Sequence, residues 1–304
     1  MNGVYGRSGG SGTRISSYKW DSGSSTAEST TGTFTTATVT MSPTHHVNTV
    51  TVTQYQVTLD SGATSALNSL TTPAVSGDNY WYDSATSATL ILNGVYGRGS
   101  GTGTRVTGYR INSGSNNSET TAGTFTVLSA LSISSAQSIA TTTVSQYQVS
   151  LDSGATAALS SITAPTVSGD AGWYDSGVKA HAGLDVGTVG TSGTQYVFTS
   201  WGTDASSNNY AQSDDITMSG PKTATAGWQT QYYLTVTSAY GSPTGEGWYN
   251  ADASASFGVT TPASGGTGVQ YVLTSWSSSD SGGYNGSLAS TSVTMDNPIA
   301  ETAT

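Results

Sequence analysis

The chain contains no cysteine, so neither disulfide bonds nor thiolate metal sites can stabilise its fold. Charge is also scarce: charged residues make up 9% of the 304 residues, and 18 acidic against 8 basic side chains give a net charge of −10. A nucleic-acid-binding protein is therefore excluded, because no lysine or arginine cluster is present to displace phosphate counterions. No apolar run of about 18 residues is present either, so we expect no membrane-spanning segment.

Glycine, serine and threonine take the place of the missing charges, and the surface must be hydrated mainly by hydroxyl and amide groups. This composition is typical of secreted all-β proteins and unusual for cytosolic enzymes. We therefore expect a secreted all-β protein.

Internal repeats dominate the sequence. MNGVYGR at residues 1–7 recurs as LNGVYGR at 92–98, and TQYQVTLDSGATSAL at 53–67 recurs as SQYQVSLDSGATAAL at 145–159. A shorter form of the unit follows, in which QYVFTSW recurs as QYVLTSW. Such self-similarity is the signature of a tandem array. We predict four modules: a partial long-type module that lacks its first two strands (1–52), a long-type module (53–144), a hybrid of the long and short types (145–228) and a short-type module cut before its final strand (229–304).

The repeat decides between two interpretations of the Asp-Ser-Gly triplets that begin at Asp60 and Asp152. An apolar strand followed by Asp-Ser-Gly is how aspartic proteases present their carboxylates, so an aspartic-type hydrolase is one hypothesis. In the third copy the corresponding residue is Thr237, and a catalytic carboxylate is not dispensable in one copy. We therefore predict turn chemistry, with the aspartate accepting backbone N–H bonds and the glycine at positive φ, and no enzymatic activity.

Apolar residues alternate with polar ones at a period of two, which predicts strands with one buried face. In the third strand of each copy two large side chains stand three residues apart, as Ile15 and Tyr18 do. This spacing places them on opposite faces of a regular strand. We also predict a strand over residues 34–41 and one turn of helix within residues 65–70.

The modules join without a linker. TVTVTQYQVTL, TTTVSQYQVSL and TATAGWQTQYYLTV carry the last strand of one module directly into the first strand of the next. Because neither proline nor a glycine-serine linker intervenes, neighbouring modules are not expected to swing freely. The predicted fold is an array of small β-grasp-like or β-sandwich-like modules arranged as an extended rod. Its expected partners are other copies of itself or neighbouring repeats.

The segments TQYYLTV, GWYN, QYVLTSW and SVTMDNP, with the TATAGW ending, resemble divergent internalin B-type repeats of bacterial and archaeal surface proteins. The resemblance covers residues 173–304 well, and residues 1–172 through their internal alignment. It implies a small β-grasp-like module, an extracellular location, an archaeal source, and a stalk, adhesive or cell-envelope role without catalytic residues. The longer copies depart from the pattern, since Tyr18 and Tyr109 replace the tryptophan of the third strand.

Four tryptophans recur at matched strand positions, as core or junction residues do, which leaves Trp20 and Trp81 as candidates for surface contacts with glycans. Asn116, in Asn-Asn-Ser, and Asn285, in Asn-Gly-Ser, are N-glycosylation sequons that we expect to be exposed. No spacing of aspartates or histidines matches a metal-binding motif, so neither a metal nor another cofactor is predicted.

These observations favour a non-enzymatic extracellular structural protein that forms a cell-surface stalk, filament or envelope component. The alternative is an adhesin module that binds carbohydrate or another surface. It predicts exposed aromatic rings around Trp20 or Trp81, whereas the structural hypothesis predicts those rings buried at module junctions. An aspartic-type hydrolase would need Asp60 and Asp152 to face one another.

Overall fold

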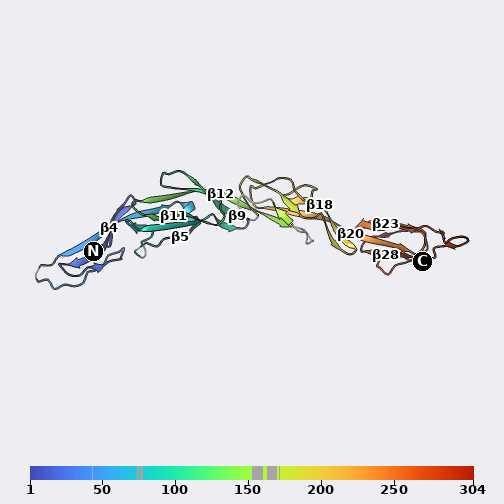
Figure 1. The fold of residues 1–304 in the computed structure, drawn as a ribbon, viewed down its shortest axis with the longest axis horizontal. Coiled ribbons are helices and arrows are strands. Elements are labelled where there is room, and N and C mark those ends of the chain that lie inside the picture. Colours follow the sequence, from blue (N-terminus) through green and yellow to red (C-terminus); the bar gives the residue numbers. More distant parts are fainter. Residues whose placement is uncertain (43, 74, 76–77, 153–159, 163–169, 171) are drawn as a thin grey trace. The chain divides into compact units, whose positions relative to one another are not determined.

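The computed structural model describes residues 1–42, 44–73, 75, 78–152, 160–162, 170 and 172–304 (Figure 1). Strand accounts for 56% of the chain and helix for 2%, which confirms the prediction of an all-β protein. The described residues form one mixed sheet of 16 strands and five small sheets of two or three strands each. Among them, no helix has both the length and the apolar character needed to cross a membrane.

The strands are short except at the repeat junctions. The first thirteen described elements are β1 (Val4–Ser8), β2 (Ser11–Trp20), β3 (Thr26–Ala27), β4 (Val47–Leu59), α1 (Ser61–Ala66), β5 (Leu67–Leu70), β6 (Trp81–Asp83), β7 (Ser87–Asn93), β8 (Val95–Gly99), β9 (Thr102–Ile111), β10 (Asn117–Ser118), β11 (Thr124–Ser132) and β12 (Gln137–Asp152). The others are β13 (Ser160–Ile162), β14 (Trp173–Asp175), β15 (Lys179–Ala180), β16 (Ala182–Leu184), β17 (Thr188–Thr191), β18 (Thr194–Thr203), β19 (Ile216–Thr217), β20 (Lys222–Ser238), β21 (Pro243–Thr244), β22 (Gly247–Asn250), β23 (Ser254–Val259), β24 (Ala263–Ser264), β25 (Gln270–Tyr271), β26 (Trp276–Ser277), β27 (Ser290–Thr294) and β28 (Ile299–Ala303).

The chain divides into two compact units. The first comprises Met1–Gln148, Ala164–Gly177 and Ser219–Pro221, and the second comprises Val149–Thr163, Val178–Met218 and Lys222–Thr304. Each unit has its own core. In the first, Val57, Leu90 and Ile139 are almost completely buried. In the second, the rings of Phe257 and Trp276 meet edge to face with their centroids 4.8 Å apart. Burial of each such side chain contributes about 1.5–3 kcal/mol to the stability of the fold.

Three long strands carry the chain through the repeat junctions (Figure 1). The strands β4, β12 and β20 have 13, 16 and 17 residues, so the junction segments are continuous strands, as predicted. Each long strand begins parallel to the end of the preceding one: Gln137 of β12 lies beside Val57 of β4, and Lys222 of β20 beside Val149 of β12. The start of β28 pairs in the same way with the end of β20.

The third strand of the first three copies contains a β-bulge, and this corrects a prediction. In β2 the register shifts between Ile15 and Ser17, and β9 and β18 shift at the equivalent place. Ile15 and Tyr18 are both buried, at 6% and 8% exposure, and the rings of Phe198 and Trp201 lie 5.4 Å apart. The prediction that these side chains lie on opposite faces is wrong, because the bulge adds one residue to the two-residue period.

The first Asp-Ser-Gly triplet begins the helix α1. The carboxylate of Asp60 accepts hydrogen bonds from Ala63 N at 2.6 Å and from Thr141 N at 2.7 Å, which confirms its predicted role as an acceptor for backbone N–H groups. The expectation of positive φ at Gly62 is wrong, since this residue is helical. Glycine is required there by a close approach, because an added Cβ would lie 2.2 Å from Thr141 Oγ1.

Two predicted elements differ in the structure. The helix covers Ser61–Ala66 and not a turn within residues 65–70, because the cap at Asp60 fixes its start. Residues 34–41 form no strand. In the next copy the corresponding strand β11 pairs with β7, and the described chain has no equivalent of β7 beside residues 34–41.

Replacing Asp60 by alanine is expected to destabilise the first unit by about 2–4 kcal/mol, because the helix loses its cap and the N–H of Thr141 loses its acceptor. Urea unfolding followed by far-ultraviolet circular dichroism measures the change. The exposed Asp185, in the second unit, provides the control: Asp185→Ala should change the free energy of unfolding by less than about 0.5 kcal/mol. Equal effects of the two substitutions would contradict the capping role.

Candidate functional site

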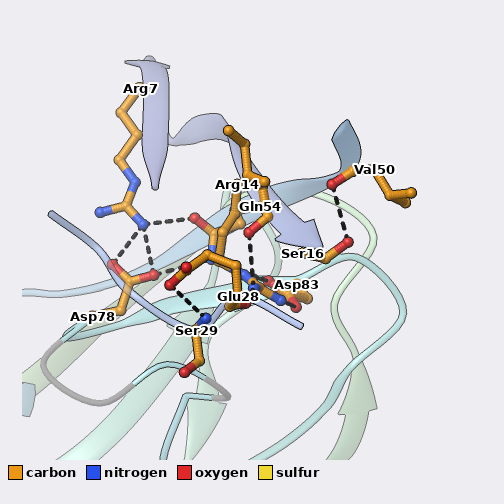
Figure 2. A network of polar contacts seen from close by, with 10 residues as sticks. Arg7, Arg14, Ser16, Glu28, Ser29, Val50, Gln54, Asp78 and Asp83 are labelled. Atoms are coloured by element: carbon orange, nitrogen blue, oxygen red, sulfur yellow. Dashed lines mark hydrogen bonds and ion pairs between the residues drawn. The ribbon is translucent and has the colours of Figure 1, made fainter. Parts of the chain in front are cut away.

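A buried polar cluster in the first unit joins two repeat copies (Figure 2). Arg7, from β1, points toward Asp78 and donates to Gln54 Oε1 and Asp78 Oδ2, each at 2.6 Å. Gln54 Nε2 donates to Asp78 and Asp83 at 3.0 Å each. Arg14, from β2, donates through Nε to Asp83 at 3.1 Å and forms an ion pair with its other oxygen. Gln54 and Asp78 are only 1% and 2% exposed, whereas the Arg7 side chain is 24% exposed.

The same cluster is built again one copy later. Arg98 donates to Gln146 Oε1 at 2.6 Å and forms an ion pair with Asp170. Gln146 Nε2 donates to Asp170 at 2.9 Å and to Asp175 at 3.1 Å. Arg105 donates through Nε to Asp175 Oδ1 at 3.0 Å and pairs with Oδ2 of the same carboxylate. The five residues of the first cluster align, in the same order, with the five residues of the second cluster in the repeat. We call the two clusters together the junction network.

A tryptophan covers one guanidinium in each cluster. Arg7 Cζ lies 4.3 Å from the ring centroid of Trp81, and Arg98 Cζ lies 4.4 Å from that of Trp173. A cation–π contact of this kind contributes about 0.5–2 kcal/mol. The prediction that Trp81 is not one of the recurring tryptophans is therefore wrong, because Trp173 is its counterpart in the next copy. The Trp81 ring is half-buried at the junction of two copies.

In the second unit, neutral side chains occupy the positions that correspond to Arg105 and Asp175. The strand register places Val197 where Arg105 stands in the preceding copy, and Asn250 where Asp175 stands. Gln231, the counterpart of the buried glutamine, donates to Asn250 Oδ1 at 2.9 Å. The arginine and its aspartate are thus exchanged together, which avoids an unpaired buried charge.

Burial and hydrogen bonding oppose each other at Asp175. Burial alone would raise the pKa of this carboxyl, but the hydrogen bonds from Arg105 and Gln146 outweigh it and hold the pKa of Asp175 below its ordinary value. The ionised form is therefore the stable one in the fold. Its contribution to stability is present above the ordinary pKa of about 3.9 and is lost as the pH falls through the lower, folded-state pKa. Both carboxylate oxygens are occupied by donors, an arrangement suited to holding strands together.

The sequence analysis did not single out the junction network, although a signal was present. Its four arginines are half of the 8 basic residues in the chain. Basic side chains that recur in register, in a chain so poor in charge, indicate fixed partners. Those partners were not apparent because 71 residues separate Arg7 from Asp78.

The hydrolase hypothesis depends on Asp60 and Asp152. Both oxygens of Asp60 accept backbone N–H bonds at a helix start, which favours the structural interpretation of its triplet. Asp152 ends β12, but Ser153 and Gly154, which complete the second triplet, lie outside the described residues.

The candidate glycosylation sites are both exposed, as expected. Asn116 lies in the loop before β10, and Asn285 lies in a loop where its Oδ1 accepts from Ser278 N at 3.0 Å. Glycan attachment at either asparagine stays a prediction. Trp20, the last residue of β2, is half-buried and stands edge-on to His45, with ring centroids 6.5 Å apart.

Two aspartates of the second unit form ion pairs with lysines. Asp204 pairs with Lys222, and Asp215 pairs with Lys179. Within the part of the chain that the structure describes, no three His, Cys, Asp or Glu side chains gather closely enough to hold a metal ion.

Comparisons of this chain with models of protein families, with curated proteins and with solved structures find no match. The functional argument therefore depends on the geometry and on the repeat pattern.

A buried carboxyl group also lies outside the junction network. Glu301, in β28, is 0% exposed and accepts from Tyr284 N at 2.7 Å through Oε1, while Oε2 has no hydrogen-bond partner. Burial raises the pKa of Glu301 above its ordinary value, in spite of the hydrogen bond from Tyr284, and the nearby Asp280 acts in the same direction as burial. Among the described residues no cation pairs with this group, so burial disfavours its ionised form.

A double-mutant cycle tests the junction network, with the natural exchange at Val197 and Asn250 as its template. The single change Asp175→Asn should cost about 3–5 kcal/mol, because it leaves the Arg105 guanidinium buried without its anion. Arg105→Val together with Asp175→Asn should cost less than the sum of the two single changes by about 1–3 kcal/mol. Urea unfolding at neutral pH gives the four free energies, and strict additivity would refute the coupling.

The substitution Glu301→Gln should stabilise the second unit near neutral pH and have little effect in acid. Because burial raises the folded-state pKa, the stability associated with this carboxyl is present below the ordinary glutamate pKa and is lost as the pH rises through the raised value. Thermal unfolding from about pH 4 to about pH 8 should show the wild type losing stability relative to the variant. The exposed Asp296 supplies a control, since Asp296→Asn should leave this dependence unchanged. A constant difference between wild type and Glu301→Gln would contradict the assignment.

Proposed function

We propose that this chain is a non-enzymatic, extracellular structural protein in which tandem β modules form an extended rod, as part of a cell-surface stalk, filament or envelope. The junction network is the observation that carries this proposal. Arg7 and Arg14 belong to the first module, whereas Asp78 and Asp83 belong to the second. Charged side chains of one module therefore find their partners in the next.

The network gives the two junctions that contain it a resistance to separation. Pulling two modules apart would leave guanidinium and carboxylate groups without partners, and breaking one buried pair costs about 3–5 kcal/mol. The continuous strands β4, β12 and β20 add backbone hydrogen bonds on both sides of each junction. Tension on such an array is carried by the backbone of a continuous strand and, where the network is present, also by its salt bridges.

Sequence features support the proposed location and partners. The hydroxyl-rich composition and the resemblance to internalin B-type surface repeats favour a cell surface, and the resemblance favours an archaeal source. The sequons at Asn116 and Asn285 are exposed and accessible to a glycosylating enzyme. The partners of such a rod are other copies of the chain or neighbouring repeats.

An adhesin that binds carbohydrate is the second candidate, and one observation favours it. Trp248 is 39% exposed and stands edge-on to Tyr233, with ring centroids 5.1 Å apart. An exposed ring held in a fixed orientation can stack on a sugar. Trp20 and Trp81, the residues proposed for this role from the sequence, are more buried than Trp248. A glycan-binding screen of the wild type and Trp248→Ala tests this candidate.

Small-angle X-ray scattering with light scattering tests the structural function. A compact protein of 304 residues has a radius of gyration of about 19 Å, and an extended rod should exceed this value clearly at monomer mass. Negative-stain microscopy of native surface material should show fibres or stalks. A radius near 19 Å would overturn the rod, and peptidase activity abolished by Asp60→Asn would overturn the non-enzymatic function.

A further inference from the structure

The strand β28 carries a buried carboxyl group at a position that is apolar in the two preceding copies. The strand register aligns Glu301 with Ala224 of β20 and with Ile139 of β12. Glu301 is 0% exposed, and among the described residues its Oε2 has no hydrogen-bond partner. The Oδ1 atom of Asn297 is also buried without such a partner. Buried oxygen atoms without donors are rare in folded proteins, and a bound ion is one of their causes.

In the two preceding copies, a polar residue two positions earlier holds the side chain that caps the strand. Asp204 accepts hydrogen bonds from Thr223 N at 2.8 Å and from Lys222 Nζ at 3.1 Å. Asn112 accepts from the backbone N–H that follows Gln137 and donates to Oε1 of that glutamine at 2.9 Å. Both polar atoms of the capping side chain are therefore bonded within the copy.

The last copy keeps the cap but lacks its polar partner. Asp280 accepts from Ala300 N at 2.7 Å, and Ile299 stands where the preceding copy has Lys222. An apolar side chain thus replaces the lysine that balances the aspartate, and a second carboxyl group, that of Glu301, is added nearby. The exchange brings two acidic groups together and removes the cation that the preceding copy provides.

One turn, residues 280–284, connects these oxygen atoms. Glu301 Oε1 accepts from Tyr284 N at 2.7 Å, and Asn297 Nδ2 donates to Ser281 O at 3.2 Å. The second contact fixes the orientation of the amide, so the atom of Asn297 without a partner is its carbonyl oxygen. The first residue of the turn supplies the other carboxylate. The turn therefore gathers two carboxylates and an amide oxygen.

We propose that Asp280, Asn297 and Glu301 form a calcium site, in which the ion takes the place that the lysine ammonium holds in the preceding copy. Calcium binds carboxylate and carbonyl oxygens in flexible geometries, and water completes its coordination. Asp280 and Asn297 are partly exposed, which gives the ion access from solvent. The third ligand is an amide, so the site differs from a cluster of three acidic side chains. A bound cation also accounts for a carboxyl group at a position that is otherwise apolar.

The calcium site goes beyond the structural function proposed above and does not depend on it. Calcium would tie the turn to the start of β28 and stabilise the last copy, because the ion binds the folded form. Scattering measures the shape of the chain, whereas the site is tested by calcium binding, so either proposal can fail alone.

Isothermal titration calorimetry of the intact chain with calcium chloride at neutral pH tests the site. Binding of one ion per chain is expected, with a Kd of about 0.1–1 mM, the range of extracellular calcium modules. Magnesium chloride should bind at least about tenfold more weakly, because magnesium requires near-ideal octahedral geometry. Calcium at about 10 mM should also raise the unfolding temperature of the wild type.

Three variants identify the ligands. Glu301→Gln keeps the shape of the side chain and should weaken calcium binding at least about tenfold, because the site loses a charged ligand. Ile299→Lys restores the lysine of the preceding copy and should abolish calcium binding. Asp204→Asn is the matched control, since Asp204 is already paired with Lys222, and it should bind calcium as the wild type does. Circular dichroism establishes that each variant is folded.

The response of stability to calcium separates an ion from a proton at Glu301. Without calcium, Glu301→Gln should be more stable than the wild type near neutral pH, and saturating calcium should reduce or reverse this difference. Absence of binding and of thermal stabilisation up to about 10 mM calcium would overturn the site and leave a proton to neutralise Glu301. Equal calcium affinities of the wild type and Glu301→Gln would overturn it as well, because the ion would then be bound elsewhere.

Discussion

The fold depends on backbone pairing between the end of one long strand and the start of the next. Val57 lies beside Gln137 and Val149 beside Lys222, so each long strand finishes in the sheet where its successor begins. This arrangement leaves no free linker between copies. It also brings side chains of neighbouring copies into one buried layer, where every polar group must find a partner.

The junction network follows from that constraint. A buried arginine is tolerated only where a carboxylate is fixed beside it, and the continuous strands fix both. The junction in the second unit follows the same rule without charges, because Val197 and Asn250 replace an arginine and its aspartate together. An uncharged junction avoids the desolvation of two ions, whereas a charged junction resists the loss of either partner. The chain contains both solutions to one packing problem.

Several features of the fold could be predicted from the sequence because their causes are local. The alternation of apolar and polar residues predicted the strands, and the absence of proline and linkers predicted that strands continue through the junctions. Asp60 was correctly expected to accept backbone N–H bonds. The errors have identifiable physical causes. The bulge that places Ile15 and Tyr18 on one face has no marker in the two-residue period. The glycine of the triplet is needed for the approach of Thr141, a residue distant in the sequence.

By itself the sequence determined the all-β class, the tandem repeat and the continuity of strands through each junction, since these depend on neighbouring residues and on self-similarity. Only the tertiary structure decided which charges meet. Arg7 reaches Asp78, and Arg98 reaches Asp170, across about seventy residues, and the register that joins them is set by the pairing of whole strands.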